Sequence, residues 1–140
     1  MIRLITWFRP YSGYLLVVWI IIIFTLSSIP SLKPLRIETQ KSFIRLDYLI
    51  HFCEYGSLAF LAYLSFAERN FRMNMKKYFL ITAGLILFSL IDEFHQKLIP
   101  GRTFNVKDIY SNIAGLVAGL VFCVVVFRML ERKQDSFTTK

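Results

Sequence analysis

Long hydrophobic runs, separated by short polar loops, dominate the pattern of the chain. The runs cover residues 11–29, 46–66, 78–97 and 106–130. Each has about the 20 residues that a helix needs to cross the hydrocarbon core of a bilayer, and the runs are continuous rather than alternating, which favours helices over a membrane barrel. The pattern therefore predicts an all-α membrane protein, a four-transmembrane-helix bundle over residues 1–130, with a polar cytoplasmic tail at 131–140 that we expect to fray.

The composition agrees with a chain that is solvated by lipid. Hydrophobic residues make up 56% of the 140 positions and charged residues 19%, whereas soluble domains average about 45–50% and about 25%. The net charge of +8 comes from short basic clusters between the apolar runs, so we expect no nucleic-acid binding. Cys53 and Cys123 lie inside hydrophobic runs without CxxC spacing, which predicts packing residues and no disulfide.

Lys and Arg residues are distributed unevenly between two sets of loops. The N-terminus, the second loop and the tail hold ten of them, and the first and third loops hold seven. By the positive-inside rule, this bias predicts that both termini are cytoplasmic. No small-residue cleavage site follows the first run before Pro30, so we expect that run to be retained as a span.

Polar residues gather at three helix ends that an antiparallel bundle brings to one membrane surface. They are Asp47, His51 and Glu54 at the start of the second span, Asp92, Glu93, His95 and Gln96 at the end of the third, and Asp108 and Asn112 at the start of the fourth. Gly115 and Gly119 follow deeper in the fourth span, where small residues let helices approach closely. Ionisable groups inside a membrane are costly, so we expect the polar faces to line one wet cavity that opens to the outer surface.

Several of these residues also have simpler structural explanations. Asn105 and Asp108 have the spacing of a helix N-cap and its acidic first turn. His51 could be a packing histidine, and Asp92 with His95 could face interfacial water. These readings stay open at the level of sequence.

A chemical role is the alternative that the residue types favour. Arg102 would hold a phosphate or carboxylate, because its planar guanidinium bonds such groups bidentately and stays charged. His51 and Glu93 would be the general acid and base, since an imidazole titrates near neutrality and a carboxylate about one turn below the surface must be paired or neutralised. Asp47, one turn above His51, would orient the ring. A simple Glu93–Arg102 pair within a structural network also remains open.

The polar residues form a scattered pattern across most of the chain. It consists of Ser27, Ser28, Pro30, Asp47, His51, Phe52, Tyr55, Glu93, Gln96, Pro100, Gly101, Arg102, Asp108, Asn112 and Gly115. This pattern resembles the VanZ-like family of small integral membrane proteins, whose founding members are linked to teicoplanin resistance. Tyr48 departs from it, because family members often have Lys there. The resemblance implies a cell-envelope protein of the bacterial cytoplasmic (inner) membrane with its site facing outside, and supplies no settled reaction.

Two classes of function fit these observations. The first is binding of an anionic lipid-linked or cell-wall molecule without catalysis, because no residue is an obvious nucleophile. The second is a membrane-embedded hydrolase or transferase that acts on such a molecule by His/Glu acid–base chemistry. For either class, the expected substrate-binding residues are Arg102, Gln96, Asp108, Asn112 and Tyr55. The expected partner is a membrane lipid or a lipid-linked cell-wall precursor, and the oligomeric state is left open.

Metal binding is a further alternative, at His51, Glu54, Asp92 and His95. These residues form two pairs with a spacing of three, which lines metal sites in helical bundles, and their side chains suit zinc or manganese. The spacing is common by chance, so we expect no metal and no cofactor. Proton-coupled transport is disfavoured, because four spans without an internal repeat are few for a transporter.

Overall fold

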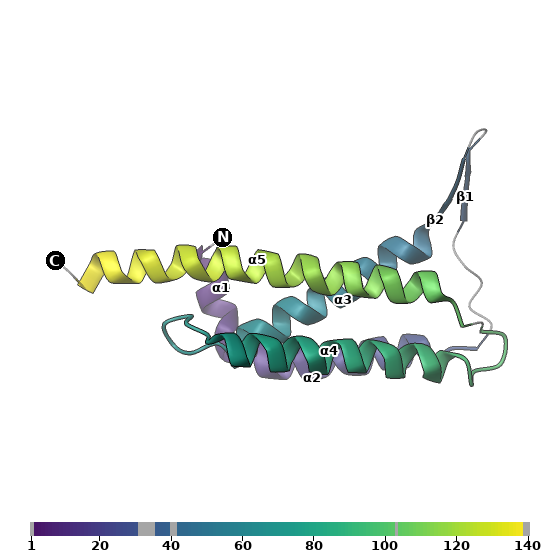
Figure 1. The fold of residues 1–140 in the computed structure, drawn as a ribbon, viewed down its shortest axis with the longest axis horizontal. Coiled ribbons are helices and arrows are strands. Elements are labelled where there is room, and N and C mark those ends of the chain that lie inside the picture. The colour runs from purple at the N-terminus through teal and green to yellow at the C-terminus, as the bar shows by residue number, and fades with distance from the viewer. Residues whose placement is uncertain (1, 31–35, 40–41, 103, 139–140) are drawn as a thin grey trace.

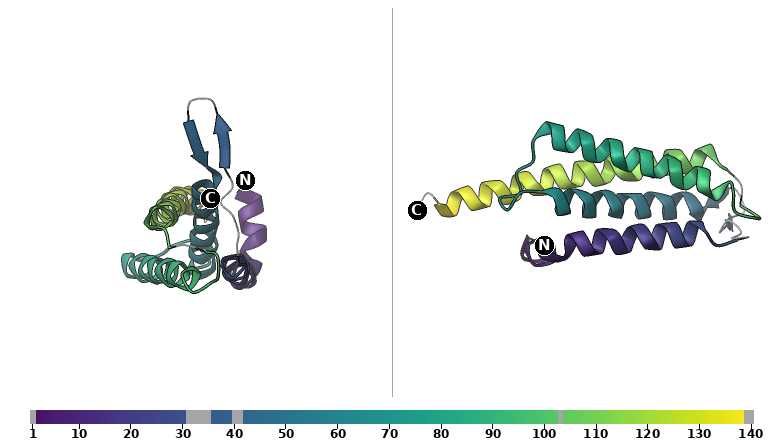
Figure 2. Two further views of the ribbon diagram at one scale, coloured as in Figure 1. Left: turned by 90° about the vertical axis from the view of Figure 1, so that its right-hand side faces the viewer. Right: turned by 90° about the horizontal axis from the view of Figure 1, so that it is seen from below.

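The computed structural model describes residues 2–30, 36–39, 42–102 and 104–138. In chain order, its elements are α1 (Ile2–Phe8), the 3-10 helix η1 (Arg9–Tyr11), α2 (Ser12–Ser27), β1 (Arg36–Thr39), β2 (Ser42–Arg45), α3 (Leu46–Phe66), α4 (Met75–Gln96) and α5 (Val106–Thr138). The four long helices run along one direction and form a bundle (Figures 1 and 2). The predicted all-α architecture is confirmed.

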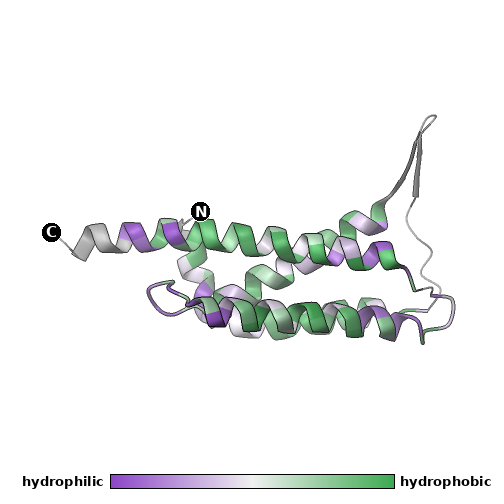
Figure 3. Cartoon of the chain, in the orientation of Figure 1, coloured by the Kyte–Doolittle hydropathy of each residue, from purple (hydrophilic) through white to green (hydrophobic). Residues whose placement is uncertain are grey.

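Within the described residues, four helices are long and apolar enough to cross a membrane. They are Leu4–Ser27, Leu46–Phe66, Met75–Gln96 and Val106–Lys133. Polar residues gather toward the ends of these helices and apolar residues fill the middle (Figure 3). Large apolar side chains such as Tyr14, Val17 and Phe79 lie on the outer surface of the bundle, where lipid solvates them. The chain is a membrane protein.

Local sequence signals set the boundaries of the helices. α3 covers the predicted range 46–66. α4 begins at Met75, ahead of the predicted start, because Oδ1 of Asn74 accepts a 2.8 Å hydrogen bond from the main-chain N–H of Lys77 and caps the helix. The first span begins earlier than predicted and is broken, because Pro10 lies in η1 between α1 and α2.

A short antiparallel hairpin lies between α2 and α3. Its strands pair so that Arg36 is opposite Arg45 and Thr39 is opposite Ser42. The hairpin projects away from the bundle beside the start of α3 (Figure 1). The structure thus adds two strands to a loop that the hydrophobic pattern left without secondary structure.

α3 is the central helix of the bundle, and it packs most extensively against α5. A Cβ atom added to Gly115 would overlap the carbonyl oxygen of Phe52. One added to Gly119 would lie 2.7 Å from the carbonyl oxygen of Gly56. Both positions need glycine because the two backbones touch, which confirms the predicted close approach of helices at these glycines.

The turn between α3 and α4 contains an unusual backbone conformation at Phe71. Its φ of 61° lies in the left-handed region, which is unfavourable for an aromatic residue. The side chain is buried, and its ring centroid lies 5.7 Å from that of Phe127. The Phe71 main-chain N–H also donates a 2.8 Å hydrogen bond to the carbonyl oxygen of Glu68. These contacts maintain a conformation that glycine adopts more readily.

Both ends of the chain lie at one end of the bundle, opposite the hairpin and the α4–α5 loop (Figures 1 and 2). α5 continues as a helix to Thr138. The expectation that the tail at 131–140 frays is therefore wrong for residues 131–138. The physical reason is local propensity, because the segment begins with four strong helix formers: Glu131, Arg132, Lys133 and Gln134.

Candidate functional site

The end of the bundle opposite the termini holds hydrophilic positions of α3, α4 and α5 (Figures 1 and 3). We name the following residues the polar cluster: Tyr55, Asp92, Glu93, Gln96, Arg102, Asp108 and Asn112. All of them except the half-buried Arg102 are between 0% and 7% exposed. Glu93 is among the fully buried ones, so it faces the protein interior and not lipid. We expected these side chains to line a wet cavity, and in the structure all but Arg102 are buried and several hydrogen-bond to one another.

Gln96 is the centre of a hydrogen-bonded chain. Its Nε2 donates to Oδ2 of Asp92 at 3.2 Å and to Oγ of Ser27 at 3.3 Å. Its Oε1 accepts a 2.6 Å hydrogen bond from Nη2 of Arg102. Tyr55 completes the chain, since its hydroxyl donates to Oδ2 of Asp92 at 2.9 Å. The chain therefore joins α2, α3 and α4 to the α4–α5 loop.

Two members of this chain were not predicted as binding residues. Asp92 was expected among the residues that line the cavity and as an alternative metal ligand, and Ser27 only as part of a family pattern. The spacing of four between Asp92 and Gln96 is the signal that could have found the first contact. Sequence spacing within one helix cannot predict the contacts of Ser27 or Tyr55 with α4. Those contacts depend on how the separate helices pack against one another.

Glu93 links the end of α4 to the start of α5. Its Oε1 accepts a 2.9 Å hydrogen bond from the main-chain N–H of Asn105. Among the described residues, no ion pair joins Glu93 to Arg102, which donates to Gln96 instead. The guanidinium still lies near enough to interact electrostatically with the carboxylate of Glu93 and with that of Glu54.

Asn105 caps α5, as its spacing from Asp108 predicts. Its Oδ1 accepts a 3.1 Å hydrogen bond from the main-chain N–H of Lys107, and its Nδ2 donates to Oδ1 of Asp108 at 3.1 Å. The main-chain N–H of Asp108 also donates to the carbonyl oxygen of Asn105 at 2.9 Å. One role of Asp108 is thus structural, because an acidic group in the first turn stabilises a helix.

The side chain of His51 lies close to that of Glu54, one turn further along α3. Its Nδ1 is 4.0 Å from Oε2 of Glu54, and the two side chains are 12% and 17% exposed. Among the described residues, no hydrogen bond or ion pair joins His51 to Glu93. Asp47 is half-buried in the first turn of α3. The proposed acid and base therefore belong to one polar region without touching each other.

Several buried polar atoms lack a hydrogen-bond partner within the described part of the chain. They are Nδ1 of His51, Oγ of Ser89, Oδ1 of Asp92, Oε2 of Glu93, Nδ1 of His95 and both polar atoms of the Asn112 amide. Buried polar groups in proteins are nearly always hydrogen-bonded, so each of these atoms requires an explanation. Most of them belong to the polar cluster, which makes this region the candidate binding site.

A sequence model of the VanZ/LLP1 family matches residues 11–128, a stretch that includes α2, α3, α4 and most of α5. The chain belongs to the VanZ/LLP1 family. This result confirms the resemblance that the polar pattern indicates. Searches among curated proteins and among solved structures found no match.

The alternative metal site is not assembled in this VanZ/LLP1 protein. Among the described residues, no group of three or more His, Cys, Asp and Glu side chains is placed to hold a metal ion. The ring of His95 stacks on Phe24 of α2, with centroids 4.5 Å apart. Asp92 accepts its hydrogen bonds from Tyr55 and Gln96. The geometry therefore gives no support to metal binding by these side chains.

An open, largely apolar groove of about 450 Å³ lies between α2, α3 and α5 of this VanZ/LLP1 protein. It is lined by Trp19, Gly56, Ser57, Phe60, Leu61, Ala118, Gly119 and Phe122. Gly56 directly follows Tyr55 of the cluster, and Trp19 donates a 2.9 Å hydrogen bond from Nε1 to the carbonyl oxygen of Glu54. The groove thus runs along α2, α3 and α5, and no residue of the polar cluster lines it.

Proposed function

We propose that this VanZ/LLP1 protein binds an anionic lipid-linked or cell-wall molecule at the polar cluster, and that this binding connects it with glycopeptide (teicoplanin) resistance. One observation carries the proposal: the polar cluster holds buried polar atoms without partners among the described residues, and one of them, Oε2 of Glu93, belongs to a carboxylate near the half-buried guanidinium of Arg102. Unsatisfied buried polar atoms destabilise a fold. A ligand that bonds to them would remove this cost.

The types of atom define the chemistry of the ligand. Arg102 donates one hydrogen bond to Gln96, which leaves further guanidinium N–H groups for a phosphate or carboxylate. Oδ1 of Asp92 and Oε2 of Glu93 can accept hydrogen bonds from hydroxyl or amide groups of a ligand. A bare anion would be repelled by the surrounding acidic groups. The best match is therefore a molecule with both a phosphate and several hydroxyl or amide groups, such as a lipid-linked cell-wall precursor.

The apolar groove between α2, α3 and α5 supports a ligand that is attached to a lipid. Its lining includes the aromatic side chains of Trp19, Phe60 and Phe122 and the glycines Gly56 and Gly119. A hydrocarbon chain gains free energy by contact with such a surface. A ligand whose headgroup occupies the polar cluster would place its chain along this groove.

A binding measurement on the whole protein tests the proposal. The protein in detergent is titrated with a lipid-linked cell-wall precursor, and with phosphatidylcholine as the neutral control. Arg102→Gln should weaken precursor binding by about tenfold, because it removes a charge-assisted contact. Lys97→Gln is the matched control, since Lys97 is exposed at the same end of the bundle. Equal affinity of the Arg102→Gln variant and the wild type contradicts the proposal.

A membrane-embedded hydrolase or transferase is the second candidate. The unpartnered atoms Nδ1 of His51 and Oε2 of Glu93 favour it, because a general acid or base needs an atom that is free to exchange a proton with a substrate. Incubation of the purified protein with the precursor, followed by mass measurement, separates the two candidates. A changed mass that is lost in Glu93→Gln supports the enzyme, and binding without conversion supports the binding protein.

A further inference from the structure

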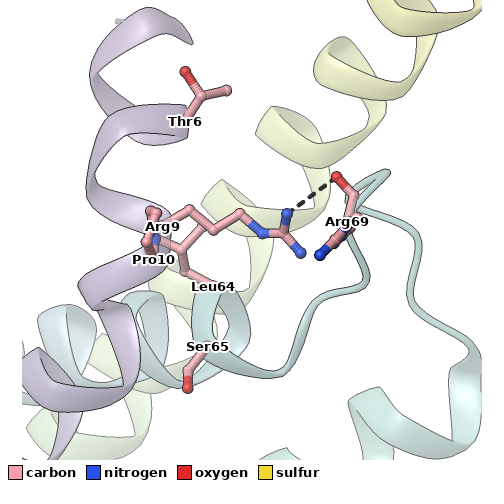
Figure 4. A pocket seen from close by; sticks show the side chains of 6 residues that line it. All are labelled: Thr6, Arg9, Pro10, Leu64, Ser65 and Arg69. Atoms are coloured by element: carbon pink, nitrogen blue, oxygen red, sulfur yellow. Dashed lines mark hydrogen bonds between the residues drawn. The ribbon is translucent and has the colours of Figure 1, made fainter.

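A second candidate site lies at the other end of the bundle, where the chain termini are found. It is a pocket of about 400 Å³ lined by Thr6, Arg9, Pro10, Leu64, Ser65 and Arg69 (Figure 4). The pocket is formed where α1 and η1 meet the end of α3 and the turn that follows it. None of these residues belongs to the polar cluster, so this pocket is independent of the proposed function.

Arg9 is held in a fixed position at this pocket. Its Nη1 donates a 3.1 Å hydrogen bond to the carbonyl oxygen of Arg69 (Figure 4). Its Nη2 donates a 2.9 Å hydrogen bond to the carbonyl oxygen of Ala67. Its guanidinium carbon also lies 5.0 Å from the centre of the Phe71 ring. A guanidinium has five N–H groups, so Arg9 retains donors for a ligand while its orientation is fixed.

Two positive charges meet at the pocket without a carboxylate partner. Arg69 is exposed, and it lies near enough to Arg9 for the two charges to repel each other. Among the described residues, neither guanidinium is within ion-pair distance of an acidic group. The adjacent Glu68 is engaged by Lys77, whose Nζ lies 3.3 Å from its Oε1. An anion in the pocket would relieve this repulsion.

The position of the pocket relative to the membrane surface suggests the source of the anion. Arg9 lies five residues inside the start of the first span, Leu4–Ser27, and Arg69 lies three residues beyond the end of the second, Leu46–Phe66. Both are therefore close to the level at which lipid headgroups meet water. Arginine is suited to phosphate because its planar fork donates paired hydrogen bonds. Basic residues at a membrane surface also attract anionic lipids.

We propose that Arg9 and Arg69 form a binding site for a phosphate group, supplied by the headgroup of an anionic lipid in the leaflet on the side of the termini. Arg9 provides a preorganised donor, and Arg69 provides a mobile second guanidinium that closes on the phosphate. The acyl chains of the lipid remain in the bilayer beside α2 and α3.

Lipid-dependent thermal unfolding of the full-length protein in detergent tests this site. Addition of phosphatidylglycerol should raise the unfolding temperature of the wild type more than addition of phosphatidylcholine does. Arg69→Gln should weaken the phosphatidylglycerol effect, with a loss of affinity of about tenfold, because it keeps the carbonyl oxygen that Arg9 needs for folding. Lys76→Gln removes the same charge from an exposed residue at the same end and should leave the effect unchanged.

The remaining outcomes decide between sources or reject the site. Inorganic phosphate at matched ionic strength is the free-anion arm of the experiment. Stabilisation by inorganic phosphate that is lost in Arg69→Gln supports the phosphate site and assigns it a soluble ligand. An equal response to phosphatidylglycerol in the wild type and in Arg69→Gln overturns the proposal. An equal loss in Arg69→Gln and Lys76→Gln also overturns it, because the effect then depends only on net charge.

Discussion

The main-chain N–H of Asn105 donates a 2.9 Å hydrogen bond to Oε1 of Glu93, and the carboxylate thereby fixes the start of α5 against the end of α4. The second oxygen of the same group, Oε2, is buried and has no partner among the described residues. One oxygen of this side chain thus serves the fold, and the other is the atom that the proposed ligand would contact. Variants that treat the two oxygens differently can separate these roles.

Glu93→Gln should preserve the fold and impair ligand binding. The amide oxygen can still accept the hydrogen bond from Asn105, so we expect the free energy of unfolding to stay within about 1 kcal/mol of the wild type. Glu93→Ala removes the acceptor and should cost about 1–3 kcal/mol. Thermal unfolding in detergent measures both variants. Equal destabilisation by Gln and Ala would contradict the assigned role of the Oε1 atom.

Gly115→Ala should destabilise the contact between α3 and α5. The added methyl group would overlap the carbonyl oxygen of Phe52, and overpacking of this kind costs about 1–3 kcal/mol. Gly84→Ala is the control, because a Cβ atom at Gly84 meets nothing within 4 Å and alanine favours a helix. The unfolding temperature should therefore fall for Gly115→Ala and stay level or rise for Gly84→Ala. A level temperature for Gly115→Ala would show that the two backbones can separate at little cost.

Tyr55→Phe should show how much the hydrogen bond from the Tyr55 hydroxyl to Asp92 stabilises the protein. The change leaves Oδ2 of the buried Asp92 with Gln96 as its remaining donor among the described residues, and should cost about 1–3 kcal/mol. Tyr63→Phe is the matched control, because Oγ1 of its partner Thr82 keeps a hydrogen bond to a main-chain carbonyl oxygen. Unfolding experiments on the two variants should rank Tyr55→Phe as the more damaging. The reverse ranking would argue against a structural role for the Tyr55–Asp92 contact.

Phe71→Gly should be more stable than Phe71→Ala, although glycine is usually the less stable choice. Both changes remove the ring that packs on Phe127 and beneath Arg9. Alanine keeps the unfavourable φ of 61°, whereas glycine adopts it freely, a difference of about 1 kcal/mol. Comparison of the two unfolding temperatures checks this prediction. A more stable alanine variant would mean that the turn changes its conformation once the ring is removed.

Reporter fusions should place both ends of the chain in the cytoplasm. The two ends lie at one end of the bundle (Figure 1), and the loops on that side hold ten of the Lys and Arg residues against seven on the other. A phosphatase fused to the C-terminus should be inactive, and a fluorescent protein fused there should fold and fluoresce. An active phosphatase would reverse the orientation and place the polar cluster on the cytoplasmic face.

Hydropathy was sufficient to predict the spans, because residence in lipid depends on the summed apolar character of about 20 residues. The range 46–66 and the start of the fourth span at Val106 agree with the structure for this reason. The cap at Asn105 was also predictable, since capping depends on residues within one turn. The hairpin was not, because two strands of four residues each produce too weak a pattern to distinguish from a loop.

The contacts of the polar cluster depend on how each helix is rotated about its axis, which the apolar pattern does not specify. Spacing placed Gln96 on a polar face, yet only the packed bundle shows that its amide joins Ser27, Asp92 and Arg102. For the same reason, the sequence suggested an ion pair between Glu93 and Arg102, whereas in the structure Arg102 donates its hydrogen bond to Gln96.

At Gly115 and Gly119 the backbones of α3 and α5 touch, with no side chain between them that could change rotamer. We therefore expect these two helices to move together. A conformational change that admits a bulky headgroup must come from displacement of α2 or α4, whose contacts with the rest of the bundle are made by side chains such as Ser27, Phe24 and Gln96. The entrance to the buried polar groups is therefore expected between a stationary pair of helices and a movable pair.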